Sequence, residues 1–462
     1  MNRRQDNYTF LTSGPIPKVI GTMAVPTIIS MLVTSLYNIV DTFFVGQIDT
    51  QSTAAVGVVF AVMSIIHAVG FFFGHGSGNF MARQLGAKNR EAAQRMASTG
   101  MAYAVFFGLV ITLVGESMLR PLALALGSTA TILPYAESYM GVILLGAPVM
   151  TASLVLNNQM RFQGNAFYAM VGVVSGAIIN VVLDPLFIFV FGWGVTGAAV
   201  ATVVSQTCGL LLLVVMNRKS QSIRLRLRDV SLRWRYAVEI VAGGTPSLVR
   251  QTLGCIATIM LNVAAATYGD AAIAAMSIVA RITFVVFSII IGLGQGFQPL
   301  CGFCYGAGNH ERVKRAFWFS VGVGTIFLCV CTLAGWFFAE PVITVFRDDS
   351  EVIRIGTEAF RWQLLAYPLG ALTMLSNMLL QTIRKPWRAN ILAAARRGLF
   401  FIPLILMLPR HYGLLGVEIC QPVCDVLAFV LTLPILYSAL RQLKGEGIDR
   451  QEVGWNQTDE FQ

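Results

Sequence analysis

The segment Asn180-Val-Val-Leu-Asp184-Pro185 places an amide and a carboxyl group in the middle of the apolar run 170–191. Asn180 and Asp184 are one helical turn apart and therefore share a helix face. Pro185 removes a backbone N–H donor directly after the carboxylate, which loosens the helix at this point. Aspartates at membrane depth are rare, because inserting one costs about 2.5–3.5 kcal/mol. The segment therefore predicts a functional site inside a membrane-spanning helix.

The composition is that of a polytopic membrane protein. Of the 462 residues, 56% are hydrophobic and 12% are charged, and the mean hydropathy is +0.69. Soluble domains carry about 25% charged residues. We therefore predict an all-α protein with twelve transmembrane helices. The apolar stretches lie roughly at residues 17–45, 53–81, 96–115, 133–157, 167–191, 195–216, 237–267, 271–300, 316–339, 353–381, 389–409 and 414–440.

The distribution of positive charge predicts the orientation of the chain. The net charge is +10, and Lys and Arg concentrate in segments that face the termini, among them 218–235 and 384–397. By the positive-inside rule, both termini are expected on the cytoplasmic side of the plasma (inner) membrane. This asymmetry accounts for the basic charge without a nucleic-acid partner.

An internal repeat relates the two halves of the chain at a shift of about 220 residues. Gly76 corresponds to Gly296, and the loop Gly86-Ala-Lys-Asn89-Arg-Glu91 resembles Gly306-Ala-Gly-Asn309-His-Glu311. Each half then holds six helices in the same topological sense, which predicts two lobes around a central cavity, an architecture typical of transporters. The expected domains are an N-terminal lobe (1–216), a basic cytoplasmic linker (217–235), a C-terminal lobe (236–440) and a cytoplasmic tail (441–462).

A second aspartate lies in the first apolar run, in Tyr37-Asn38-Ile-Val-Asp41, and the repeat does not reproduce it, because Asp41 corresponds to Leu261. Carboxylate, amide, hydroxyl and phenol oxygens can bind a hard cation such as Na⁺ or relay protons. The alternative is that these groups only hold the bundle together through hydrogen bonds. We predict an ion-coupling site for H⁺ or Na⁺ in the N-terminal lobe. Its candidate residues are Asp41, Asp184, Asn180, Thr202, Tyr37 and Asn38.

Two prolines are candidates for a conformational switch. Pro26 lies about four turns before Asp41, and Pro185 directly follows Asp184. A proline-loosened helix can bend when a nearby acid is protonated, although a static kink fits the sequence equally well. The candidate residues of a substrate cavity are Gln206, Asn157, Met31 and Asp425.

Several motifs together resemble the multidrug and toxin extrusion (MATE) family over roughly residues 15 to 440. They are Val25-Pro26, Tyr37-Asn-Ile-Val-Asp41-Thr-Phe-Phe-Val-Gly46, Gln84-Leu-Gly86-Ala-Lys-Asn89, the segment Asn180 through Pro185, and Gly194-Val-Thr-Gly197-Ala-Ala. The resemblance implies an antiporter that exports amphipathic, often cationic, drugs and dyes in exchange for H⁺ or Na⁺. It implies no cofactor beyond that ion. The family's N-lobe cation site, a candidate Na⁺ site, maps onto Asp41, Asn180, Asp184 and Thr202, with Tyr37 nearby.

The chain departs from one branch of that family. The NorM-like branch carries acids in helices seven and ten, where this chain reads Thr258-Ile-Met-Leu-Asn262 and Met374-Leu-Ser-Asn377. The chain is therefore more similar to the DinF-like branch, which uses the N-lobe acids. Neither the branch nor the oxygen ligands decide between H⁺ and Na⁺.

Two other functions compete with export. A lipid or lipid-linked oligosaccharide flippase would favour Arg and Lys at membrane depth, where only Arg250, Arg281 and Arg361 are candidates. An intramembrane lipid-modifying enzyme is less consistent with four histidines and no clustered metal ligands. We therefore expect a transporter rather than an enzyme, working on small molecules within the bilayer as a monomer.

Overall fold

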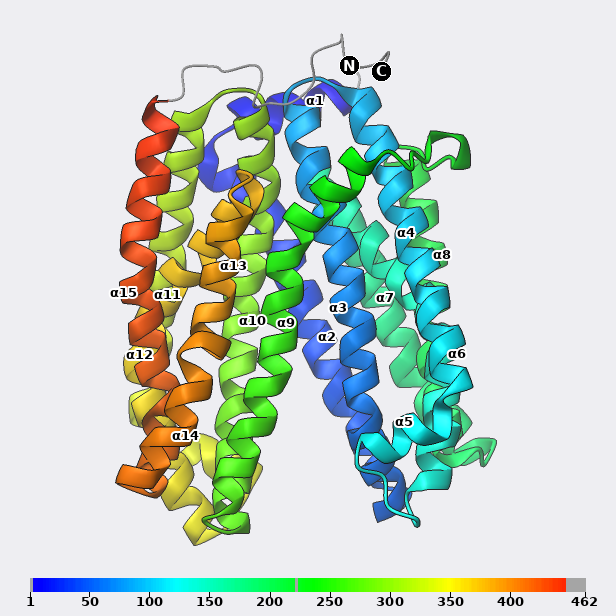
Figure 1. Ribbon diagram of the computed structural model, residues 1–462, viewed down its shortest axis with the longest axis vertical. Coiled ribbons are helices and arrows are strands. Elements are labelled where there is room, and N and C mark those ends of the chain that lie inside the picture. The colour runs from blue at the N-terminus through cyan, green and yellow to red at the C-terminus, as the bar shows by residue number, and fades with distance from the viewer. Residues whose placement is uncertain (1–2, 221–222, 446–462) are drawn as a thin grey trace.

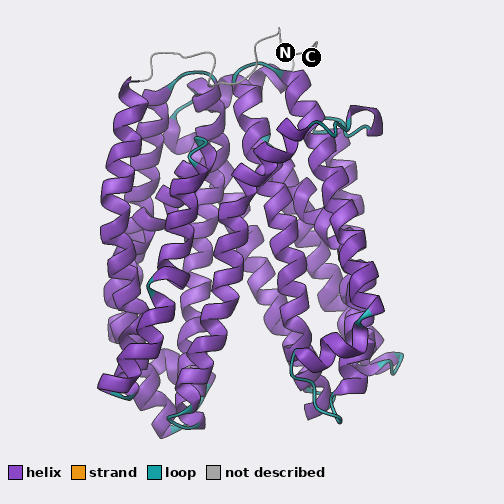
Figure 2. Ribbon diagram, viewed as in Figure 1, coloured by secondary structure: helices purple, strands orange, loops and turns teal. Residues whose placement is uncertain are grey.

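The structure, a computed structural model, describes residues 3–220 and 223–445, and over these residues it consists of helices joined by short loops (Figure 2). Within them, twelve helices are long and apolar enough to cross a membrane, which confirms the predicted all-α, twelve-span fold. The first half of the chain contains α2 (Ile16–Gly46), α3 (Thr50–Gly86), α4 (Arg90–Ser117), α6 (Leu133–Phe162), α7 (Ala166–Pro185) continued by the π-helix η1 (Leu186–Val190), and α8 (Gly194–Lys219).

The second half repeats this order with one further interruption. Its helices are α9 (Trp234–Ala266), α10 (Asp270–Gly306), α11 (His310–Phe346), α12 (Ser350–Thr382), α13 (Pro386–Ala394) continued by the π-helix η3 (Ala395–Leu399) and α14 (Phe401–Tyr412), and α15 (Leu414–Gly445). Three short helices, α1 (Arg3–Ser13), α5 (Leu119–Ala125) and the 3₁₀-helix η2 (Leu227–Asp229), lie outside the spans.

The helices extend beyond the apolar stretches because their ends are fixed by caps rather than by hydropathy. Asn89 precedes α4 and its side chain accepts a hydrogen bond from the Ala92 amide at 3.1 Å. Asn309 caps α11 in the same way, from the Arg312 amide at 3.1 Å. Such caps satisfy amides that the first helical turn leaves without partners. The repeated loop that the sequence shows is therefore a repeated helix-capping turn.

The two halves form two bundles related by the internal repeat, and they diverge at the end opposite the termini (Figure 1). Gly86 of α3 lies against the carbonyl of Phe303, and Gly306 of α10 lies against the carbonyl of Arg83. Gly86 and Gly306 are 220 residues apart, and so are Arg83 and Phe303, so the internal repeat relates the two contacts to each other. Only glycine allows the backbones to approach this closely. The two halves thus meet around a pseudo-two-fold axis, near the end that carries the termini.

Two further contacts between the lobes also depend on glycines that allow close backbone approach. Gly76 of α3 packs against the backbone of Ile240 in α9, and Gly296 of α10 packs against the backbone of Ala24 in α2. All of these residues lie in the terminus-side parts of their helices. The molecule is therefore closed on the side of the termini, and the bundles lie apart on the other side.

The position of Arg396 and Arg397 corrects the prediction that segment 384–397 faces the termini as a whole. Both arginines lie in η3, within the eleventh membrane span, and the Arg396 side chain is 14% exposed. The span begins as early as Pro386, so these residues lie several turns inside it. Hydropathy did not reveal this, because the charge of Arg396 is compensated by an acid on another helix.

Candidate ion-coupling site

The two membrane-depth aspartates of the N-terminal bundle come together where α2 packs on α7. The carboxyl groups of Asp41 and Asp184 lie within hydrogen-bonding reach of each other. Asp184 is completely buried. The pairing follows from helix packing, because each acid lies near the end of its helix that is remote from the termini. Two residues that are 143 positions apart thus share one site.

Asn180 lies on α7 with Asp184 and adds an amide group to the site. Its Nδ2 donates a hydrogen bond to Asp184 Oδ1 at 3.1 Å, the contact expected for positions one turn apart. Three buried oxygens at this site have no hydrogen-bond partner among the described residues: Asp41 Oδ1, Asp184 Oδ2 and Asn180 Oδ1. A buried acceptor left unpaired is costly, so this arrangement favours a site that takes up a proton or a cation.

Further polar groups come from α2 itself and from one more helix, α8. Tyr37, one turn before Asp41 on α2, lies beside the Gln206 side chain of α8. Thr202 is buried on α8, one turn before Gln206. Tyr37 therefore shares α2 with Asp41, and Thr202 and Gln206 lie on α8, which packs against the helix that carries Asp184. The predicted ligand Asn38 lies on α2, but its side chain is outside the described residues.

The sequence interpretation missed Tyr139 of α6. Its side chain is fully buried, and its hydroxyl interacts electrostatically with Asp41, Asp184 and Tyr37. The internal repeat contained a usable signal, because the counterpart of Tyr139 is Ala359. Like the acids, this phenol is present in the N-terminal half alone.

The helix that carries Asp184 changes its geometry directly after the acid. α7 ends at Pro185 and continues as a π-helix over Leu186–Val190. π-Helical turns widen the backbone and occur frequently at functional sites. The proline supplies the local cause, since it lacks the amide that would bond to the preceding turn.

The predicted cavity residues Met31 and Asn157 lie away from the acids. Met31 lies on α2, about three turns before Asp41. The Asn157 amide donates to the Ala169 carbonyl at 2.9 Å and so ties α6 to α7. Asn377 makes the equivalent bond to Ala389 at 2.6 Å in the other lobe. This repeated bond indicates a packing role for Asn157.

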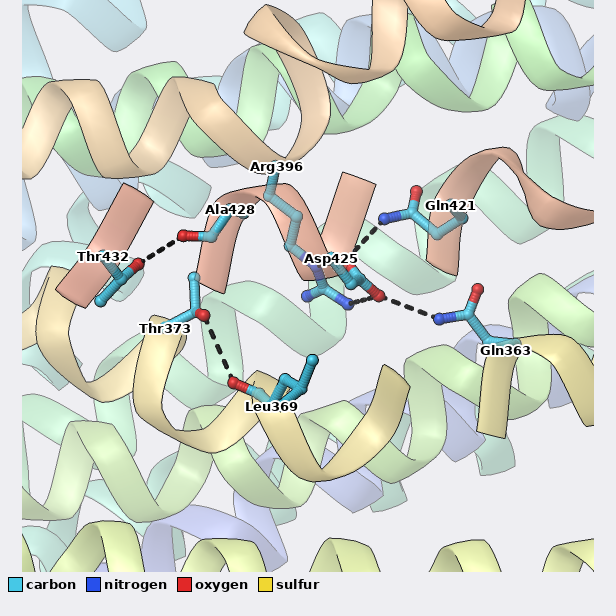
Figure 3. Close-up of polar contacts among 8 residues, drawn as sticks. All are labelled: Gln363, Leu369, Thr373, Arg396, Gln421, Asp425, Ala428 and Thr432. Atoms are coloured by element: carbon cyan, nitrogen blue, oxygen red, sulfur yellow. Dashed lines mark hydrogen bonds and ion pairs between the residues drawn. The ribbon is translucent and has the colours of Figure 1, made fainter. Parts of the chain in front are cut away.

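The fourth predicted cavity residue, Asp425, lies in the C-terminal lobe in a fully paired network (Figure 3). Arg396 Nε donates to Asp425 Oδ1 at 2.5 Å and its Nη2 donates to Oδ2 at 3.2 Å. Gln421 and Gln363 add donors to the two oxygens at 2.9 and 3.0 Å. The Arg396 guanidinium also lies 4.4 Å from the centre of the Phe287 ring. Both carboxylate oxygens are thus saturated.

The two lobes therefore contain opposite electrostatic environments. In the N-terminal lobe two acids lie together with neutral neighbours, whereas in the C-terminal lobe one acid is neutralised by an arginine. Among the residues that the structure describes, no three His, Cys, Asp or Glu residues gather as a metal site. A cation at the N-lobe site would accordingly rely on two carboxylates plus neutral oxygens.

Comparison with known proteins identifies the family of this fold. The sequence model of the MatE family matches residues 26–186 and 246–407, two segments that begin 220 residues apart. "Multidrug export protein MepA" from Staphylococcus aureus (strain MSSA476) is 26% identical over 94% of this chain and 96% of its own.

Two solved structures share the fold. One is described as "Outward-facing conformation of a multidrug resistance MATE family transporter of the MOP superfamily", with a TM-score of 0.89 and 26% identity over 94% of this chain and 98% of that chain. The other is a MOP superfamily transporter from Pyrococcus furiosus, described as having a "reverse polarity of binding pocket". Its TM-score is 0.88, with 27% identity over 95% of this chain and 98% of that chain. The chain is therefore a multi-pass membrane protein that belongs to the MATE family of transporters, which are not enzymes.

Proposed function

We propose that the protein exports amphipathic or cationic drugs and dyes in exchange for H⁺ or Na⁺, by alternating access. Drug export as the activity is supported by the similarity to the multidrug export protein MepA and to the outward-facing multidrug resistance MATE transporter. The observation that carries the exchange is the pair Asp41 and Asp184, with buried oxygens that lack partners. The ion is a substrate of this site, and no further cofactor is required.

The acidic pair provides a simple coupling mechanism. Two carboxylates at close range repel each other, so a proton on one of them, or a Na⁺ ion between them, relieves the repulsion. Asn180 and Tyr37 hold the two acids in place, and Thr202 adds a neutral oxygen on α8. Exchange requires that the ion favours a conformation with low affinity for the drug, and linkage then requires that the drug weakens ion binding by the same factor.

α2 is the helix that transmits ion binding to the rest of the molecule. Its first half packs on α10 of the other lobe, where Ile28 contacts Gly292, and its second half carries Asp41. Pro26 lies in the first half, and the Ser30 hydroxyl bonds back to the Pro26 carbonyl at 3.0 Å. Proline and such back-bonding both soften a helix. We propose Pro26, together with Pro185, as the switch that bends α2 and α7.

The orientation follows from the charge distribution. We propose that both termini are cytoplasmic in the plasma (inner) membrane, so the closed side faces the cytoplasm. The diverging bundles of Figure 1 would then correspond to an outward-facing state. Because one chain supplies both lobes and the core that they share, we propose that one chain transports as a monomer.

We also propose that the protein is nearer to the DinF-like branch than to the NorM-like branch. α9 carries Asn262 near its diverging end and α12 carries Asn377 near its terminus end, in place of acids. Asn377 accepts a hydrogen bond from Arg250 at 2.7 Å, so a positive group occupies this part of the C-terminal lobe. A cation site beside Asn377 would meet electrostatic repulsion.

The central test is ethidium export from proteoliposomes under an imposed pH gradient or an imposed Na⁺ gradient. The wild type should export under one of the two gradients, which identifies the ion. Asp41→Asn and Asp184→Asn should each abolish gradient-driven export, because the amide cannot release a proton or carry the charge. Pro26→Ala should slow export while Asp41 and Asp184 still bind the ion.

Asp348→Asn is the matched control, because this aspartate is exposed in the loop between α11 and α12. It should export as the wild type does. Export by the Asp41 and Asp184 variants at the wild-type rate would overturn the coupling site, whereas failure of all proteins, including the control, would overturn drug export itself.

One observation favours the flippase alternative enough to test it. Arg161 is almost completely buried and bonds to Gln295 of the other lobe at 2.7 Å and to Asn158 at 2.5 Å, both neutral partners. Arg250 lies close enough to His75 and Arg161 to form a positive region. An anionic lipid headgroup would fit such a region. The test is the translocation of a fluorescent lipid in the same liposomes. Translocation by the wild type that is lost in Arg161→Gln would favour a flippase over a drug exporter.

A further inference from the structure

The segment between the two lobes is fixed to the surface of the N-terminal lobe. The Arg226 amide donates to Ser98 Oγ at 3.1 Å, and the Ser231 amide donates to Thr99 Oγ1 at 3.0 Å. Both acceptors belong to α4. Ile223 is buried in the core beside the same helix. The described part of this segment, residues 223–233, is therefore a defined surface rather than a loose connection.

This surface, together with Trp234 at the start of α9, exposes large apolar side chains. Leu227 is 91% exposed, Leu232 is 80% exposed and Trp234 is 79% exposed. The segment joins the end of α8 to the beginning of α9 and runs beside α4 and α8 at the terminus end (Figure 1). Helix ends mark the level of lipid headgroups, where tryptophan is enriched. Exposure of these three side chains to water is unfavourable, whereas their insertion into the outer part of a bilayer is favourable.

A basic hollow of about 650 Å³ lies between this segment and the start of α4. Two acids also line it, but both have partners: Glu91 pairs with Arg95 at 2.7 Å, and Asp229 accepts from Gln94 at 2.6 Å and lies 3.9 Å from Arg228. The two acids offset two of the four arginines. Positive charge is therefore in excess. The charged lining residues are Arg90, Arg95, Arg228, Arg233, Glu91 and Asp229.

We propose that this hollow binds the headgroup of an anionic phospholipid from the leaflet at the terminus end. The phosphate would lie among the arginines, whose guanidinium groups match its geometry. Leu227, Leu232 and Trp234 would insert beside the same lipid. Charge and apolar surface occur together here, and a lipid offers both, whereas a soluble phosphate offers only the charge. The segment connects the lobes, so the bound lipid anchors the N-terminal lobe at the point where the two lobes are joined.

Trp234 allows a direct test with the full-length protein in liposomes. Brominated phosphatidylglycerol and brominated phosphatidylcholine quench a tryptophan that they contact, and subtraction of the Trp234→Phe signal isolates Trp234 from the other tryptophans. The wild type should prefer phosphatidylglycerol at Trp234. Arg228→Gln/Arg233→Gln should weaken that preference by about thirtyfold, which two arginines near a membrane surface predict.

Arg218→Gln/Arg315→Gln removes the same charge from two exposed residues outside the hollow and should keep the wild-type preference. Equal quenching of the wild type by the two lipids would overturn the proposal, and so would an equal loss in the two double variants. Added glycerol 3-phosphate should leave the quenching unchanged; displacement of the brominated lipid at millimolar concentration would show that the hollow recognises soluble phosphate instead.

Discussion

Two buried carboxylates in opposite lobes, Asp184 and Asp425, show how far the surroundings of a residue determine its role. Asp425 receives donors from Arg396, Gln363 and Gln421, so its charge is fully compensated. Asp184 receives one amide donor and lies beside a second acid. A buried carboxylate that is paired with a positive group does not destabilise the fold as long as that partner remains. A buried carboxylate without a positive partner lowers the stability of the folded protein. The second arrangement is expected where function, rather than stability, maintains the residue.

This contrast predicts opposite effects on stability. Asp425→Asn should destabilise the protein by about 3–5 kcal/mol, because Arg396 then remains buried without a counter-charge. Asp184→Asn should be neutral or stabilising, because it removes an uncompensated acid and keeps the shape of the side chain. Thermal unfolding in detergent, followed by intrinsic fluorescence, measures both.

The double variant Arg396→Met/Asp425→Leu provides the control for that prediction. It removes both charges together and should recover most of the stability that Asp425→Asn loses. A larger loss of stability in Asp184→Asn than in Asp425→Asn would contradict the assignment of the two roles.

At the scale of elements, glycines set the distance between helices of the two lobes. A Cβ on Gly306 would meet the carbonyl of Arg83, a backbone atom that cannot move aside cheaply. Gly322, on α11, has open space around its Cβ position. The same substitution at the two sites therefore separates the effect of lobe contact from the effect of helix propensity.

We predict that Gly306→Val separates α3 from α10 and Gly322→Val does not. Cys301 lies one to two turns before Gly306 and is fully buried, so its reaction with a thiol reagent reports this separation. Its labelling rate, followed by peptide mass spectrometry, should rise at least tenfold in Gly306→Val. Unchanged labelling of Cys301 in that variant would mean that the contact does not depend on glycine.

The sequence allowed the elements to be predicted better than their contacts. Apolar length identified all twelve spans, and the repeat indicated the two lobes, because both depend on local or periodic patterns. The sequence also predicted that Asp41 and Asp184 share a site, because aspartates are rare at membrane depth. It did not predict the Arg396–Asp425 pair, because only helix packing shows that Arg396 of η3 lies inside a membrane span and faces Asp425 of α15. Tyr139 escaped for a similar reason, since helix packing brings it to the acids.

At the scale of the whole molecule, one ion-pair cluster connects the lobes on their closed side. Glu239 of α9 pairs with Arg83 of α3 at 2.9 Å and with Arg384, after α12, at 2.6 Å. Arg83 also donates to the Thr382 carbonyl at 3.0 Å. Arg83 and Glu239 are both buried. Opening of this side requires that the contacts between Arg83 and the other lobe break.

We therefore predict that Glu239→Gln shifts the molecule toward the state that is open on the terminus side. Removing one member of a buried ion pair costs about 3–5 kcal/mol, and 3 kcal/mol changes a two-state ratio by roughly a hundredfold. Spin labels on unnatural amino acids at positions 124 and 345, on opposite lobes of the diverging side, should show a shorter distance in Glu239→Gln. Glu91→Gln removes the exposed pair with Arg95, which lies within α4, and such pairs contribute about 0–1 kcal/mol. It should retain the wild-type distance. If both variants retain it, the cluster holds its own helices together but does not determine which side of the transporter is open.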